Sequence, residues 1–144
     1  MIEIVELQSL TQAQALEVKA LMGELSPGIE VSPDDLIRVA EAPGTHFFAA
    51  VDTEGRIVGC ASLCVFVSPT GRKASVEDVV VRSACRGEHI GRRLMERLIG
   101  YAREKLAPVD LHLTSRPQRV AANNLYRSLG FRQRETNVYL LAIE

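Results

Sequence analysis

Hydrophobic residues along this chain follow two periods, and the periods change from segment to segment. Alternation of apolar and polar positions is typical of β-strands, because successive side chains of a strand point to opposite faces. It predicts a strand over 2–7. Largely apolar runs predict a hairpin of strands over 45–52 and 56–67 around "TEG", further strands over 73–82 and 109–115, and one or two short strands within 131–144. Apolar residues spaced four apart are typical of helices. They recur from Ile90 to Ala102, which predicts a helix from about Gly91 to Leu106.

Local signals mark three further helices. Thr11, with a glutamine three positions later, matches a capping box and predicts a helix that runs to Leu25. Ser32 is followed by a proline and two aspartates, which is typical of a helix start, and the Pro-Gly pair at 43–44 would end that helix. A last helix is expected over 119–130, where its final glycine would end it.

The predicted elements follow the order β-α-α-β-β-β-α-β-α-β, with no internal repeat and no linker. The strand at 79–81 reaches the strand at 109–114 through a helix, and such crossovers join parallel strands in a right-handed sense. The fold class is therefore α/β or α+β, with a mixed central sheet flanked by helices. We expect residues 1–144 to form one domain.

Composition narrows the class of protein. The chain has 144 residues, 47% of them hydrophobic and 24% charged, which is ordinary for a globular protein. No apolar run approaches the ~20 residues of a membrane span, and the N-terminus lacks the features of a signal peptide. Cys60, Cys64 and Cys85 lack metal-ligand spacing. We expect reduced thiols in a cytoplasmic protein, with the first two in the core, no bound metal and no membrane partner.

Charge is distributed unevenly along the chain. Residues 1–55 hold ten acidic and two basic side chains, whereas residues 56–144 hold eight acidic and fifteen basic ones. Such asymmetry can mark two ligands of opposite sign. Scattered surface charge is the other interpretation of the same counts.

The segment "CRGEHIGRRL" places three arginines, Arg86, Arg92 and Arg93, at the start of a predicted helix. A helix N-terminus already carries partial positive charge, so cations there cost stability unless an anion binds. Gly87 and Gly91 would let the backbone approach such an anion. The pattern is neither a P-loop nor a dinucleotide-binding motif. Interspersed glutamates and few aromatic residues also disfavour a nucleic-acid partner.

Two motifs resemble the GNAT superfamily of acetyl-CoA-dependent N-acetyltransferases. The apolar run 79–81 and the following "RGEHIG" resemble its acyl-CoA-binding motif, Arg/Gln-x-x-Gly-x-Gly/Ala, with His89 where the family usually has glycine. The segment "AANNLYRSLGF" is similar to the family signature A-x-x-L-Y-x-x-L-G-F. The order of elements matches as well, so the resemblance covers essentially the whole chain and implies the GNAT fold.

The resemblance implies a binding site for acetyl-CoA as co-substrate. Main-chain groups of Val79 and Val81 would pair with its pantetheine arm, and the N–H groups of residues 87–92 would hold its pyrophosphate. Asn123 would hydrogen-bond the same arm. The implied binding residues are Val79, Val80, Val81, Arg86, Gly87, Glu88, His89, Ile90, Gly91, Arg92 and Asn123.

The implied reaction is direct attack of a neutral primary amine on the thioester within a ternary complex. Tyr126 matches the tyrosine that commonly protonates the departing thiolate, and we expect basic surroundings to lower its pKa. Glu77 is the preferred base, acting through a water molecule. On a regular strand Glu77, Val79 and Val81 would share one face. Asp78, on the other face, is the alternative base.

The remaining polar residues carry weaker signals. His112 is expected to be a core histidine, and His46 carries no functional signal. Ser115 and Arg116 are expected to face acetyl-CoA or the acceptor.

Several functional alternatives stay open. The segment around 76–87 also resembles glucosamine-phosphate N-acetyltransferases, whereas the C-terminal motif resembles small bacterial members of the superfamily. A CoA-binding sensor without turnover is a further alternative. The acceptor pocket is expected between the first two helices and the "SPTGR" loop, and the C-terminal strands could form the edge of a homodimer.

Overall fold

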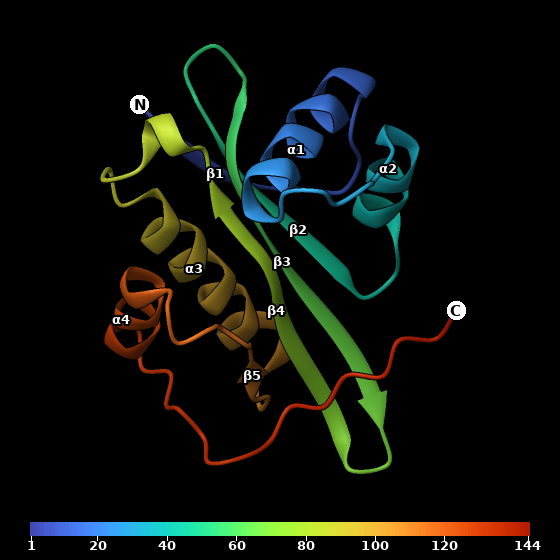
Figure 1. The fold of residues 1–144 in the computed structure, drawn as a ribbon, viewed down its shortest axis with the longest axis vertical. Helices are drawn as coiled ribbons and strands as arrows, with labels where there is room; N and C mark the ends of the chain where they lie inside the picture. The colour runs from blue at the N-terminus through green and yellow to red at the C-terminus, as the bar shows by residue number, and fades with distance from the viewer. The chain divides into compact units, whose positions relative to one another are not determined.

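The first 113 residues form a mixed five-stranded sheet with helices against it (Figure 1). The computed structural model describes residues 1–144, which form two compact units, Met1–Leu113 and Thr114–Glu144. The strands of the sheet lie side by side in chain order: β1 (Glu3–Leu7), β2 (Thr45–Val51), β3 (Ile57–Ser68), β4 (Gly71–Val81) and β5 (Leu111–His112). Neighbours from β1 to β4 are antiparallel, and β4 and β5 are parallel, as the predicted crossover requires.

Helices cover both faces of this sheet. On one face, α1 (Gln12–Leu25) and α2 (Pro33–Glu41) bury an apolar cluster that includes Val18, Leu36, Phe47 and Val80. On the other face lies α3 (Ile90–Tyr101), where the Tyr101 ring packs 5.9 Å from the ring of Phe48. Burial of each large apolar side chain stabilises the fold by roughly 1.5–3 kcal/mol. None of the helices is both long and apolar enough to cross a bilayer.

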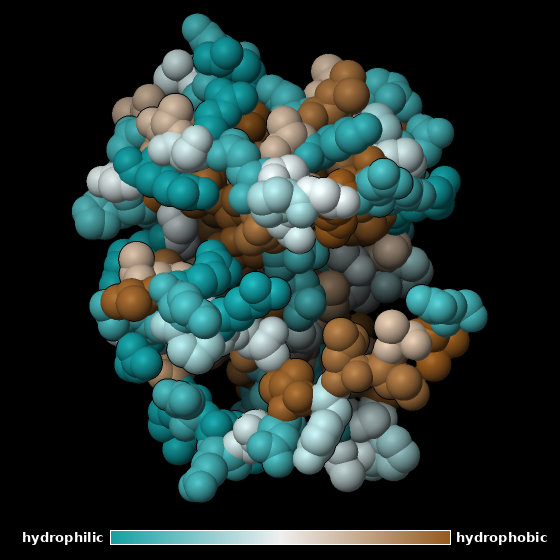
Figure 2. Space-filling model, in the orientation of Figure 1, coloured by the Kyte–Doolittle hydropathy of each residue, from teal (hydrophilic) through white to brown (hydrophobic).

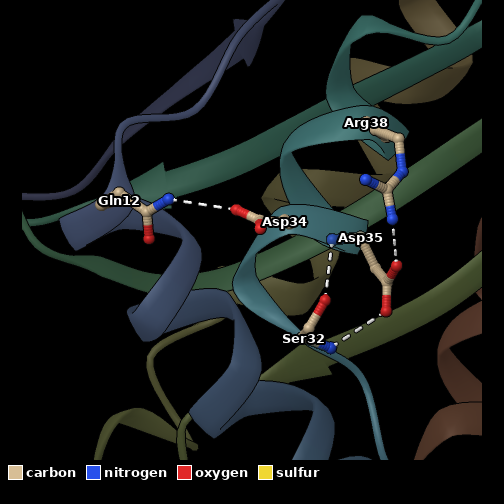
Figure 3. Close-up of polar contacts among 5 residues, drawn as sticks. All are labelled: Gln12, Ser32, Asp34, Asp35 and Arg38. Carbon is tan, nitrogen blue, oxygen red and sulfur yellow. Dashed lines mark hydrogen bonds and ion pairs between the residues drawn. The ribbon is translucent and has the colours of Figure 1, made fainter.

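The predicted caps form as the sequence indicates. Thr11 Oγ1 accepts the Gln14 N–H at 3.1 Å, and the Gln14 side chain accepts the Thr11 N–H. Ser32 and Asp35 form the same reciprocal pair at the start of α2 (Figure 3). These bonds satisfy backbone donors that a helix start leaves open, and such a cap is worth about 1 kcal/mol.

Side chains around this cap also join the two helices. Gln12 Nε2 donates to Asp34 Oδ1 at 3.2 Å, which links the starts of α1 and α2 (Figure 3). Arg38, which lies one turn after Asp35 in α2, donates a hydrogen bond to the Asp35 carboxylate. The Ser32 N–H lowers the pKa of Asp35, because the hydrogen bond favours the ionised carboxylate.

A β-bulge interrupts β4, so the side chains of this strand do not alternate between the two faces as the sequence predicted. Ser62 pairs with Glu77 and Cys60 pairs with Val80, so Asp78 and Val79 lie opposite a single residue of β3. Asp78 adopts a left-handed conformation with φ of 54°. The extra residue reverses the alternation. Glu77 therefore shares its face with Val80, and the prediction that Glu77 shares a face with Val79 and Val81 is wrong.

The second unit contains one helix, α4 (Val120–Ser128), followed by a chain without regular structure. Gly130, with φ of 101°, ends the helix as predicted, and the Phe131 N–H returns to the Tyr126 carbonyl at 3.0 Å. The predicted strands within 131–144 are absent. Their apolar side chains, such as Leu140 and Ile143, are exposed to solvent. Figure 2 shows hydrophobic residues (brown) among the hydrophilic ones on the surface. The dimer edge expected there stays a prediction.

Candidate functional site

The loop between β4 and α3 presents backbone donors at a helix start. After Val81 the chain forms a 3-10 turn (Ser83–Cys85), and Gly87 then takes a φ of 88° with no atom within 4 Å of where a Cβ would stand. His89, the N-cap of α3, has φ of 61° and its side chain does not cap the helix. The helix ladder begins with the Arg93 N–H donating to the His89 carbonyl at 3.0 Å. The N–H groups of the first turn precede this ladder and point toward the N-terminal end, where an anion is favoured.

The arginines of this loop have different partners. Arg86 Nε donates to the Val81 carbonyl at 3.3 Å, which ties the loop back to the end of β4. Arg93 Nη2 donates to the Ile2 carbonyl at 2.8 Å, so its guanidinium is bound to the backbone that precedes β1. This bond uses one of the five N–H donors of the guanidinium, and a role of Arg93 in binding an anion stays a prediction. Ile90 is buried in the core, so only its backbone is available to a ligand.

Glu24, near the end of α1, positions the same loop, and its role was missed by sequence reasoning. Its carboxylate accepts the Ser83 N–H at 2.9 Å. This hydrogen bond lowers the pKa of Glu24, with smaller contributions from the charges of Arg86 and Arg82. No local motif links a helix end to a turn 59 positions away in the sequence. The contact arises only when α1 packs on the sheet.

The outer edge of β4 separates from β5 beyond a short paired segment. β5 pairs only with Ala74 and Ser75, so the edge from Val76 to Val81 has no neighbouring strand. The Val80 side chain is buried against α1 and α2, which leaves only its main chain for binding. An unpaired strand edge can pair with an extended ligand through its N–H and carbonyl groups.

Two carboxylates lie at the bulge of this edge. Glu77 is exposed, and its Oε2 accepts the Ser75 hydroxyl at 2.6 Å. Desolvation and then the nearby charge of Glu77 raise the pKa of Asp78. The raised pKa makes the Asp78 carboxylate a stronger base, which suits it to accept a proton.

Tyr126 lies in the second unit, in the last turns of α4. It is buried, with its ring 6.0 Å from that of Phe131 in an edge-to-face contact. Burial raises the pKa of the phenol, and the charge of Arg119 opposes this only in part. The expectation of a lowered pKa is therefore wrong, because desolvation outweighs the basic surroundings.

The other polar residues predicted for the site differ in whether their hydrogen-bonding groups already have partners in the protein. Asn123 Nδ2 donates to the Arg116 carbonyl at 3.0 Å, so one of its two amide donors is already used. Ser115 Oγ is buried without a hydrogen-bond partner, which is costly unless a ligand or water completes the site. His112 is exposed on the short β5, so the prediction of a core histidine is wrong.

Comparison with known proteins gives a consistent result. Residues 16–131 match the acetyltransferase (GNAT) family. The chain is 30% identical over 132 residues to the N-alpha-acetyltransferase RimI of Mycobacterium tuberculosis. This match covers 91% of this chain and 80% of that protein. It is 31% identical over 100 residues to glucosamine 6-phosphate N-acetyltransferase 1 of Oryza sativa subsp. japonica. This second match covers 67% of this chain and 55% of that protein.

Among solved structures, an acetyltransferase of Trypanosoma brucei superposes with a TM-score of 0.78 at 26% identity. The superposition covers 99% of this chain and 100% of the other. The similarity therefore extends over both compact units.

Proposed function

The chain belongs to the acetyltransferase (GNAT) family, and from that premise we propose that it transfers an acetyl group from acetyl-CoA to a primary amine of a small molecule or peptide. The observation that carries the proposal is the combination of an unpaired β4 edge with backbone donors at the start of α3. We also propose that both units act as one domain, because the family match runs across both of them.

The residues present are suitable for binding acetyl-CoA. N–H groups of the segment 87–92 would hold the pyrophosphate, because the helix dipole and the adjacent arginines favour an anion there. Main-chain groups of Val79 and Val81 would pair with the pantetheine arm, with Arg86 keeping the end of the strand in place. Asn123 would contribute its remaining amide donor and its carbonyl oxygen.

Two proton transfers would accompany direct attack by the amine. Glu77 would remove a proton from the acceptor ammonium through a water molecule, and Asp78 is the alternative because its pKa is raised. Tyr126 would donate a proton to the departing thiolate. A free phenol is a weaker acid than a thiol by about 2 kcal/mol. Burial raises the pKa of Tyr126 and widens that gap, so donation would have to accompany bond cleavage rather than precede it.

The charge distribution favours a cationic acceptor. Residues 1–55, which include α1 and α2, carry ten acidic and two basic side chains. Such a surface attracts ammonium groups and repels sugar phosphates. The relative that is an N-alpha-acetyltransferase supports a peptide amine as acceptor, whereas the rice relative supports glucosamine 6-phosphate as the second candidate. The three free thiols favour a reducing, cytoplasmic setting.

A panel of amines with acetyl-CoA, followed through released thiol, tests this proposal. Polyamines, lysine derivatives and peptide N-termini should react faster than glucosamine 6-phosphate, and added salt should slow them. Preference for the sugar phosphate would establish the second candidate and refute the charge argument. Binding of CoA without turnover of any amine would identify a sensor.

A further inference from the structure

A pocket of about 440 Å³ opens at the other end of α3, where β1 ends and β2 begins. Its lining includes Glu6, Glu41, His46, Tyr101 and Lys105. From the N-cap of α3 to Tyr101 the helix spans roughly 18 Å at 1.5 Å per residue. The pocket is therefore separate from the donors at the start of α3, and the proposed acetyl transfer does not use it. Its volume lies in the range of small-molecule sites, about 300–1,000 Å³.

Three side chains from separate elements form a hydrogen-bonded chain in its wall. His46 Nδ1 lies 3.0 Å from Glu6 Oε2, with both side chains about four-fifths buried (22% and 19% exposed). His46 Nε2 lies 3.4 Å from the Tyr101 hydroxyl, and the two rings are 4.5 Å apart. The carboxylate can only accept, so Nδ1 donates to it. When the ring is neutral, Nε2 accepts from the Tyr101 hydroxyl. The hydroxyl oxygen of Tyr101 then keeps lone pairs for a further donor.

Two opposite charges remain in the lining once Glu6 and His46 have satisfied each other. Glu41, the last residue of α2, is exposed and takes part in no ion pair. Lys105 has only a loose contact of 3.9 Å with its exposed neighbour Glu104, and such surface pairs contribute little. Lys105 lies in a π-helical turn (Ala102–Leu106) that directly follows Tyr101. Turns of this kind are rare and occur frequently at functional sites.

We propose that this pocket is a second ligand site, which binds a zwitterionic amino acid. The ammonium group donates to Glu41 and to the Tyr101 hydroxyl oxygen, and the carboxylate accepts from Lys105. Ala40, Ala42 and the Tyr101 ring provide apolar wall for the side chain of the amino acid. A ligand with a single charge would leave either Glu41 or Lys105 without its partner.

Side-chain NMR of the histidine rings tests the proposal with L-leucine as the probe. The chain has three histidines, so a His46→Gln spectrum assigns the His46 signal, while His89 and His112 serve as internal references. L-leucine should shift the His46 signal in a saturable manner and leave that of His89 in place. Two analogues with the same side chain as leucine each lack one charged group: 3-methylbutylammonium lacks the carboxylate, and 4-methylpentanoate lacks the ammonium group. Each should bind at least about tenfold more weakly, because each forfeits a charge-assisted hydrogen bond.

Exposed positions allow a matched pair of variants. Glu41→Gln should weaken L-leucine binding about tenfold, whereas Glu104→Gln, beside Lys105 but outside the lining, should leave it unchanged. Equal binding of either control compound, no saturable shift of His46, or full affinity in Glu41→Gln would overturn the proposal. CoA, titrated separately, should move His89 and not His46, so failure at one site is distinguishable from failure at the other.

Discussion

Glu77 and Val80 lie on the same face of the sheet, the face that α1 and α2 cover, although three positions separate them along β4. In a regular strand they would point in opposite directions. The bulge at Asp78 and Val79 brings them to one face. The bulge interrupts the pairing of β4 with β3, at a point where the opposite edge of β4 has no neighbouring strand. Asp78, within the bulge, is one of the two carboxylates assigned to proton transfer.

The left-handed conformation of Asp78 gives a first prediction. Aspartate tolerates positive φ better than a β-branched residue does, and glycine adopts it without cost. Asp78→Val should therefore lower the free energy of unfolding by about 1–2 kcal/mol, whereas Asp78→Gly should change it by much less. Urea unfolding of the three proteins measures both values. Equal stability of the valine and glycine variants would contradict the left-handed backbone conformation of residue 78 in solution.

Substitution of Glu77 tests the assignment of the base. Glu77→Gln keeps the shape of the side chain and removes its proton acceptor, so kcat should fall by about 10²-fold with CoA affinity unchanged. Glu96→Gln, an exposed position on α3, is the control and should retain activity. If Asp78→Asn lowers kcat and Glu77→Gln does not, the base is Asp78.

A carboxylate at the start of α3 should abolish CoA binding. CoA should raise the Tm of the native protein by mass action. Gly91→Glu places a negative charge among the donors proposed for the pyrophosphate and should remove that shift. Gly100→Glu lies on the same helix with no atom within 4 Å of its Cβ position, and it should keep the shift. A full shift in folded Gly91→Glu would exclude the pyrophosphate from this loop.

Tyr126→Phe tests the proposed acid. The ring contact with Phe131 should survive, and kcat should fall by roughly ten- to a thousandfold, since water can partly replace the phenol. An acid must be protonated to act, and burial raises the pKa of this phenol above its usual value of about 10. The alkaline limb of the pH–rate profile should therefore lie above pH ~10, and the variant should lose it. An unchanged kcat and limb would leave Tyr126 as a packing residue.

Features that depend on neighbouring residues in the chain could be predicted from the sequence. The caps at Thr11 and Ser32, the helix end at Gly130 and the period of α3 are local, and the structure confirms them. The parallel pairing of β4 and β5 followed from the rule that a helical crossover joins parallel strands, and the structure confirms this direction.

Features that depend on packing were missed. Period-two alternation assumes a regular strand, so it could not reveal the bulge at Asp78. A short segment forms a strand only where it pairs with a neighbouring strand, and residues 131–144 pair with none. The pKa of Tyr126 depends on how far the folded chain buries its phenol, which the sequence pattern does not give. Glu6, His46 and Tyr101 meet across separations of 40 and 55 positions, so no motif could have indicated their contact.

The most direct test of the account is the stoichiometry of acetyl transfer. Purified protein, acetyl-CoA and a cationic primary amine such as a lysine derivative are incubated, and both free thiol and acetylated amine are quantified by mass spectrometry. The account predicts one acetylated amine for each thiol released, with neither product formed by Gly91→Glu. Thiol release without acetylated amine, or equal turnover by Gly91→Glu, would contradict it.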